Sequence, residues 1–144
     1  MGARYLVTKV GTALNTSKDS LTITAPAARS LKIWSIVIAG QGTASANNEI
    51  LVSRSTAGTT PTAVTPQPLN ADYAAASFTV ASLWTTDPTI GVTLRRISVN
   101  SNGGVTPVQF LPGNEIDVPG AGQISFRSAV GTGIVTIEVI VEQI

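Results

Sequence analysis

The chain has 144 residues, contains neither His nor Cys, and carries nine Lys or Arg against eight Asp or Glu. Charged residues make up only 12% of it and the net charge is +1, so it lacks the broad basic face that nucleic-acid binding requires. The missing imidazoles and thiols exclude a Ser-His-Asp triad, a thiolate nucleophile, a disulfide and every metal centre built on His or Cys. We expect a single domain over residues 1–144, without a cofactor.

Hydrophobic residues make up 43% of the chain and the mean hydropathy is +0.29. No segment reaches the roughly 18 consecutive apolar residues of a membrane helix, so we expect no membrane partner. The residues that follow Met1 predict no signal peptide. A chain this apolar and weakly charged is expected to bury part of its surface against copies of itself or within a larger assembly.

Ten short segments are predicted as strands, because Gly, Pro, Asn and Asp mark turns between runs of β-branched and apolar residues. In chain order they are residues 5–10, 20–25, 31–39, 49–54, 77–84, 92–99, 105–110, 116–118, 123–128 and 134–143. This pattern favours an all-β fold, an antiparallel β-sandwich with the two packed sheets of a jelly roll. Only residues 70–77 have the alanines for a helix, of about two turns at most.

Four segments allow more specific expectations. Residues 1–10 are either the first strand of this domain or an arm that adds a strand to a neighbouring copy. Residues 31–39 are apolar at odd and even positions, which predicts a central strand covered on both faces or packed at an interface. Residues 59–70 contain three prolines and are expected to be an extended crossover between the sheets. Residues 134–143 place apolar side chains at alternate positions, which indicates a strand with one face in the core.

Glu115 and Asp117 are the candidate acid pair, since residues two apart on a strand share a face, as paired carboxylates do in glycosidases and calcium sites. No calcium-loop pattern accompanies them, so a polar rim beside the turn at 112–113 is the favoured interpretation, and we expect no metal site. Asp72 and Asp87 lie in loops beside turn residues, and each is expected to cap or stabilise its own turn by accepting bonds from nearby backbone N–H groups. The glycines at 103–104 and 120–122 lack the Lys-Ser/Thr and the helix of a phosphate-binding loop.

Six residues are candidates for contact with a partner protein: Arg4, Tyr5, Trp34, Trp84, Arg95 and Arg96. The first two belong to the possible arm. Each tryptophan is interpreted as core or interface, and Trp84 alternatively as a stacking platform for a sugar. The adjacent arginines are expected to point to opposite faces of a strand, where each forms a surface salt bridge or contacts a neighbour.

Residues 28–33 (ARSLKI), 62–69 (TAVTPQPL), 109–118 (QFLPGNEIDV) and the alternating last strand with Glu138 and Glu142 carry a resemblance. From about residue 27 to residue 142 the chain resembles small β-sandwich proteins encoded among the head genes of tailed bacteriophages, several of which are capsid decoration, or cement, proteins. It departs from their pattern at Asn114, where a basic residue often follows the Pro-Gly turn. It also ends without their run of acids.

The resemblance implies a structural virion protein with no enzymatic activity. It implies a homotrimer that is made in the host cytoplasm, binds the major capsid protein on the outside of the head and clamps capsomer junctions. One alternative is a carbohydrate-binding or host-attachment module of a phage tail or fibre, which would expose Trp84 or Tyr73 beside hydroxyls. Another is an enzyme, in which Glu115 or Asp117 would face a second acid across a cleft of about 5–9.5 Å.

Overall fold

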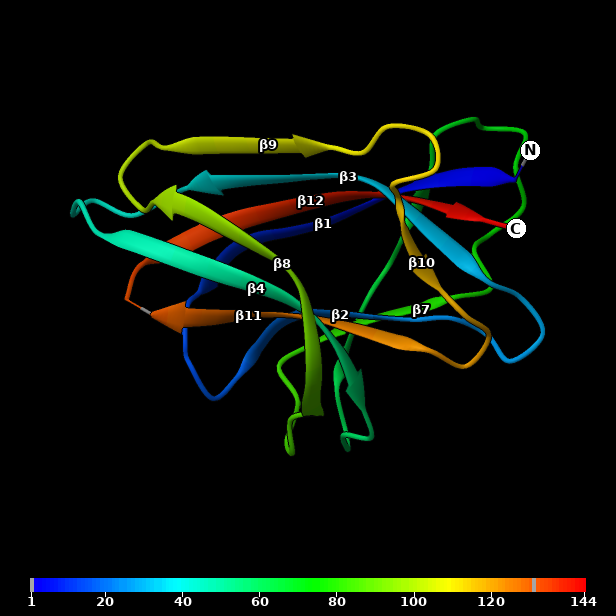
Figure 1. Cartoon of the computed structure of the whole chain (residues 1–144), viewed down its shortest axis with the longest axis horizontal. Coiled ribbons are helices and arrows are strands. Elements are labelled where there is room, and N and C mark those ends of the chain that lie inside the picture. Colours follow the sequence, from blue (N-terminus) through cyan, green and yellow to red (C-terminus); the bar gives the residue numbers. More distant parts are fainter. Residues whose placement is uncertain (1, 131) are drawn as a thin grey trace.

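The computed structural model describes residues 2–130 and 132–144, which form two antiparallel sheets packed face to face (Figure 1). The strands are β1 (Ala3–Ala13), β2 (Asp19–Thr24), β3 (Leu31–Gly40), β4 (Asn47–Thr56), β5 (Thr62–Val64), β6 (Gln67–Pro68), β7 (Thr79–Ser82), β8 (Thr89–Asn100), β9 (Val105–Gln109), β10 (Ile116–Val118), β11 (Gln123–Val130) and β12 (Ile134–Gln143). Sheet A has the order β10-β3-β12-β1-β6, with β9 also paired to β3, and sheet B has the order β5-β7-β2-β11-β4-β8. The predicted all-β sandwich is confirmed. No helix in the described ranges is long and apolar enough to cross a membrane.

The connectivity is that of a jelly roll. Both β9 and β10 pair with β3 and together occupy one position in sheet A. The main strands of sheet A then lie in the order β1, β12, β3, β9/β10, and those of sheet B in the order β2, β11, β4, β8. The first strand therefore pairs with the last, and the chain passes repeatedly from one sheet to the other, as in two Greek keys. The short strands β5, β6 and β7 are inserted between β4 and β8.

All ten predicted strands are present, with ends displaced by at most three residues. The proline-rich segment does cross between the sheets, since β5 lies at one edge of sheet B and β6 at one edge of sheet A. Because β1 pairs along its length with β12 of the same chain, the interpretation of residues 1–10 as an arm on a neighbour is wrong for the described residues. Residues 70–77 form turns instead of a helix, and Asn70 accepts hydrogen bonds from the N–H groups of Asp72 and Tyr73.

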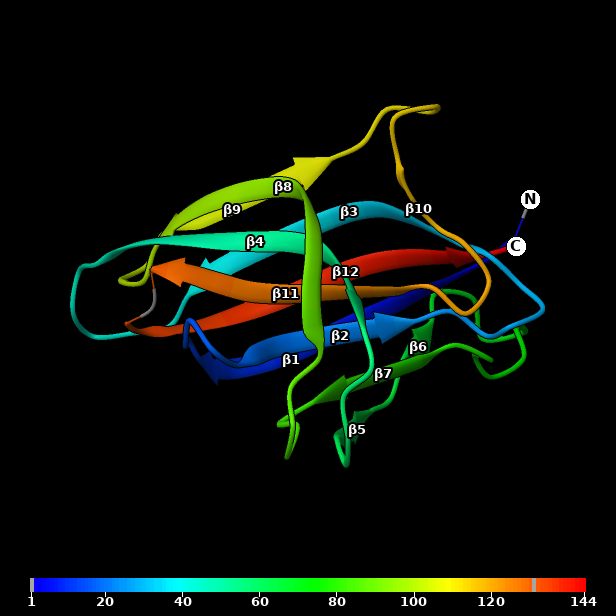
Figure 2. The ribbon, with the colours of Figure 1, turned by 60° about the horizontal axis from the view of Figure 1, so that its bottom comes forward.

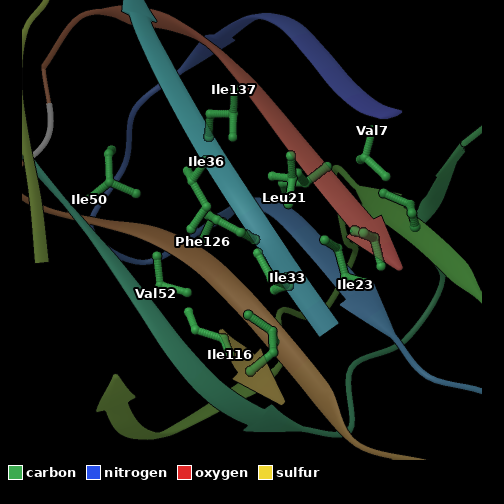
Figure 3. Close-up of a cluster of buried hydrophobic side chains, with 14 of the residues drawn as sticks. Val7, Leu21, Ile23, Ile33, Ile36, Ile50, Val52, Ile116, Phe126 and Ile137 are labelled. Atoms are coloured by element: carbon green, nitrogen blue, oxygen red, sulfur yellow. The ribbon is translucent and has the colours of Figure 1, made fainter. Parts of the chain in front are cut away.

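The core lies between the sheets and is built from aliphatic side chains of both (Figure 3). On β12 the alternation predicted from the sequence is confirmed, because Val135, Ile137, Val139 and Val141 have no exposed area. Phe126 of β11 is fully buried against them from the opposite sheet. Each such side chain contributes about 1.5–3 kcal/mol of transfer free energy, which makes this layer the main source of stability.

The apolar pattern of β3 has a cause that the sequence analysis did not foresee. Ile33 is the register partner of Val141, and Ser35 is the partner of Ile140, so Trp34 is an extra residue in β3. This β-bulge reverses which positions face the core. The fully buried residues on either side of it are Leu31, Ile33, Ile36 and Ile38. The expectation of a strand covered on both faces is therefore wrong within this chain, since its outer face is only half-buried.

Candidate functional site

A row of alternating charges crosses four strands of sheet A. It lies close to both termini, which are at the same end of the sandwich (Figure 1). Asp117 of β10 is the register partner of Lys32 of β3, Lys32 is the partner of Glu142 of β12, and Glu142 is the partner of Arg4 of β1. Register partners on neighbouring strands share a face, here the face of sheet A that points away from the core. We call these four residues the charged row, and their signs alternate from negative at β10 to positive at β1.

The two candidate acids meet at one lysine. Lys32 Nζ lies 2.8 Å from Glu115 Oε1 and 3.9 Å from Asp117 Oδ1. The hydrogen bond from Lys32 holds the pKa of the Glu115 carboxyl below its ordinary value, and the same bond raises the pKa of Lys32. The two acids thus flank a cation instead of facing each other across a cleft. Within residues 2–130 and 132–144, no group of three acidic side chains is placed to hold a metal ion.

Trp34 contacts Arg4 of the charged row, and both were predicted as interface residues. The Arg4 guanidinium carbon lies 4.8 Å from the centroid of the Trp34 ring, a cation–π distance. Trp34 Nε1 donates to Glu142 Oε2 at 2.7 Å, and the Gly2 N–H donates to Glu142 Oε1 at 2.9 Å. Glu142 is only 5% exposed, so these bonds satisfy a nearly buried carboxylate. A hollow of about 340 Å³ beside it is lined by Gly2, Lys32, Trp34, Glu142 and Ile144.

A second polar cluster lies under the outer face of sheet B, and the sequence analysis missed it. The Asp19 side chain has no exposed area and pairs with Arg127, whose Nη2 lies 2.6 Å from Asp19 Oδ1. Thr22 Oγ1 donates to Asp19 Oδ2 at 2.7 Å, and Ser125 Oγ donates to the same oxygen. The paired charge and the two hydroxyls together satisfy a carboxylate that would otherwise be costly to bury.

Trp84 closes this cluster from outside. Its Nε1 donates to Thr22 Oγ1 at 3.0 Å, and its ring lies so close to Gly58 that an added Cβ would be 2.8 Å from two ring carbons. Residues 57–60 and 83–88, which we call the clasp, are joined by backbone hydrogen bonds between Thr59 and Thr86. Figure 2 shows the chain descending from the ends of β4 and β8 into these two segments.

Asp87 joins the clasp to β2. Its Oδ1 accepts the backbone N–H of Asp19 at 2.8 Å, and its Oδ2 lies 3.4 Å from Lys18 Nζ. Asp87 does accept a backbone N–H bond, but the donor is 68 residues away, so the expected bond to a nearby N–H within the local turn is wrong for Asp87. Asp72 instead donates its own N–H to Asn70.

Arg95 and Arg96 point to opposite sides of β8, as predicted. The Arg95 guanidinium lies over the ring of Phe110, 5.2 Å from its centroid. Arg96 forms an ion pair with Glu49 of β4. Both are exposed, so each remains accessible despite its contact within the chain.

Tyr5 belongs to the core. It is 1% exposed, packs edge-to-face against Phe78 with ring centroids 5.4 Å apart, and donates its hydroxyl hydrogen to Ala74 O at 2.9 Å. Its side chain is therefore not presented at the surface, and its selection as an interface residue is corrected. The physical reason is that β1 alternates, so Tyr5 faces inward where Arg4 faces outward.

The structure thus brings Arg4 and Trp34 together and places Trp84 in the clasp and the arginine pair on β8. The sequence analysis did not select Lys32, Glu142 or Asp19 as site residues. The alternation of β12 predicts that Glu142 faces outward. The sequence near Glu142 does not indicate which strands lie beside β12. Comparisons with protein-family models, with curated proteins and with solved structures found no match to the chain.

Proposed function

We propose that the chain is a structural virion protein that decorates the outside of a bacteriophage head and stabilises the junctions between its capsomers. The proposal combines the resemblance in the sequence with one feature of the structure, an uncharged end opposite the termini. The contact with the capsid is assigned to this end. The major capsid protein is the partner, and the homotrimer is the oligomer that the resemblance implies.

The uncharged end consists of residues 41–46, 101–105, 130 and 132–134, which include no charged residue. Backbone hydrogen bonds hold its loops together, from Gly42 N–H to Ser101 O at 2.7 Å and from Gln41 N–H to Ile134 O at 2.8 Å. Val105, Val130 and Ile134 are 63%, 63% and 41% exposed there. A surface of glycines, hydroxyls and exposed aliphatic groups loses little desolvation energy when another protein covers it.

The stabilising effect would follow from mass action. A protein that binds the assembled shell, but not its separate subunits, lowers the free energy of the shell by an amount that grows with the logarithm of its concentration. Such a role requires a rigid fold and a contact surface but no reacting group, which agrees with the absence of His and Cys from the sequence.

The test is co-sedimentation of the purified chain with heads of the phage that encodes it, followed by cryo-electron microscopy. We expect bound density at local three-fold positions, and we expect V130D and I134D to reduce binding. Val92→Asp is the matched control, since Val92 is 68% exposed on β8, away from the uncharged end. A folded wild-type chain that never sediments with the heads would refute the proposal.

The second candidate, a carbohydrate-binding or host-attachment module, now depends on Tyr73. Trp84 is engaged through its Nε1 and packed on Gly58, whereas Tyr73 is 38% exposed in the loop before β7. A glycan array is the assay, and this candidate requires hits that Tyr73→Ala abolishes. An array without hits removes it.

A further inference from the structure

We propose that the outer face of sheet A binds a second copy of the chain across a two-fold axis, and that the charged row specifies this contact. The proposal concerns a different surface from the uncharged end, so it does not rest on the capsid contact. It does replace the homotrimer that the resemblance implies with a dimer, and the measured mass decides between the two. Two observations support the proposal. The charges at the two ends of the row are less well paired within the chain than the inner two, and a two-fold axis places each charge of the row opposite one of the other sign.

The two inner charges of the row are satisfied within the chain, and the two outer charges are less so. Lys32 pairs with Glu115, and Glu142 accepts hydrogen bonds from Trp34 and Gly2. At one end, the Asp117 side chain is 70% exposed, and its one ion-pair distance, to Lys32, is 3.9 Å. At the other end, Arg4 stacks on Trp34, and its buried Nε has no hydrogen-bond partner. The row therefore presents opposite charges at its two ends.

A two-fold axis matches these ends to each other. Neighbouring strands lie about 4.8 Å apart, so the three steps of the row separate Asp117 from Arg4 by about 14 Å. An axis parallel to the strands, between β3 and β12, reverses the order of the row in the second copy. Because the row has an even number of alternating charges, reversal places every charge opposite one of the other sign. Asp117 of each copy then faces Arg4 of the other, and both ends are paired at once in an isologous contact.

Apolar side chains lie beside part of the row on the same face. Leu6 and Ile140 are register partners one step further along β1 and β12, and both are half-buried on the outer side of sheet A. Ile144 is 49% exposed at the margin of the hollow beside Trp34. A second copy that covers these groups would remove apolar area from water and exclude water from the paired charges, which strengthens them.

The edge strands β6, β8 and β9 are poorly suited to edge-to-edge pairing with a second copy. Strand β8, an edge of sheet B, has two register irregularities against β4 and carries Arg95 and Arg96, devices that discourage strand addition. Pro107 in β9 has no backbone N–H to donate, and Pro68 forms half of β6. Self-association through a sheet face is therefore favoured over edge-to-edge pairing.

Two charge reversals test the contact. We expect the wild-type chain to have twice the monomer mass by sedimentation equilibrium, and R4E and D117R each to weaken the dimer about tenfold or more, since each opposes like charges twice. An equimolar mixture of the two variants should restore a dimer containing one copy of each. In that mixed dimer, one contact is the native pair and the other joins the two substituted positions with opposite signs. Native mass spectrometry with one variant isotopically labelled distinguishes this dimer from the homodimers.

The controls keep the result interpretable. Circular dichroism establishes that each variant is folded, and Asp72→Arg reverses an exposed acid outside the charged row and should leave the dimer unchanged. If Arg4→Glu fails to fold, loss of the dimer in Asp117→Arg and its retention in Asp72→Arg carry the test. A wild-type chain that stays monomeric at millimolar concentration would overturn the proposal. So would a wild-type mass of three chains, or folded variants whose mixture forms no mixed dimer.

Discussion

Replacement of Asp19 by Asn is expected to lower the free energy of unfolding by about 3–5 kcal/mol, although the two side chains have nearly the same shape. Asp19 Oδ1 accepts a hydrogen bond from Arg127 Nε at 2.7 Å and lies 2.6 Å from Arg127 Nη2, while Oδ2 accepts the hydroxyls of Thr22 and Ser125. With its amide NH₂ toward Arg127, Asn would oppose donor to donor. With its NH₂ toward Thr22 and Ser125, the hydroxyls would have to turn their hydrogens away and accept instead. The Arg127 side chain, 16% exposed, would also lose its counter-charge in a largely dry environment.

Urea unfolding followed by circular dichroism measures this loss. With a slope of about 2 kcal/mol per molar, a loss of about 3 kcal/mol moves the midpoint down by about 1.5 M. Asp72→Asn is the matched control, because Asp72 is exposed and its replacement should change stability by no more than about 0.5 kcal/mol. If Asp19→Asn with an unchanged slope costs less than about 1 kcal/mol, Asp19 does not act as a buried counter-charge and the reasoning fails.

Three further outcomes are expected. Gly58→Ala should destabilise the chain by about 1–3 kcal/mol more than Gly103→Ala in thermal unfolding, because both glycines have positive φ (101° and 72°) but only a Cβ at Gly58 meets the Trp84 ring; equal losses would contradict the packing of the clasp. The pKa of Glu115 is lowered on folding, so its contribution to stability is present above its ordinary value of 4.5 and is lost as pH falls below that value. Glu115→Gln should therefore flatten the acid side of a plot of melting temperature against pH. An unaltered plot would count against the ion pair with Lys32. The pKa of Lys32 is raised, so its contribution is present below 10.5 and is lost as pH rises through the higher folded value, and Lys32→Met should remove that alkaline decline.

The strands were predictable because their signal is local. In β12, residues two apart share a face by the geometry of an extended chain, so the side chains that enter the core can be read from spacing alone. Proline supplies a similar local constraint, since it donates no backbone hydrogen bond and confined residues 59–70 to the edges of both sheets. Both predictions can be made without information about which strands pair with each other.

The bulge at Trp34 could not be predicted from the local sequence. One extra residue in β3 changes the inward positions from odd to even, and in the sequence this resembles a strand that is apolar on both faces. The register with β12 decides between the two interpretations, and that register depends on long-range pairing. The turns at 70–77 are a similar case. Their alanines have a high helix propensity, but the segment forms turns in the folded chain.

The sequence by itself determined the fold class, the inward faces of the regular strands and the absence of imidazole and thiol chemistry. Only the tertiary structure decided that Asp117, Lys32, Glu142 and Arg4 form one row, since they come from four strands whose order in the sheet is not the order of the chain. The burial of Asp19 beneath the clasp was decided in the same way, by segments more than 60 residues apart. Alternation is a property of one strand, whereas a charge acquires its partner only when the topology sets strands side by side.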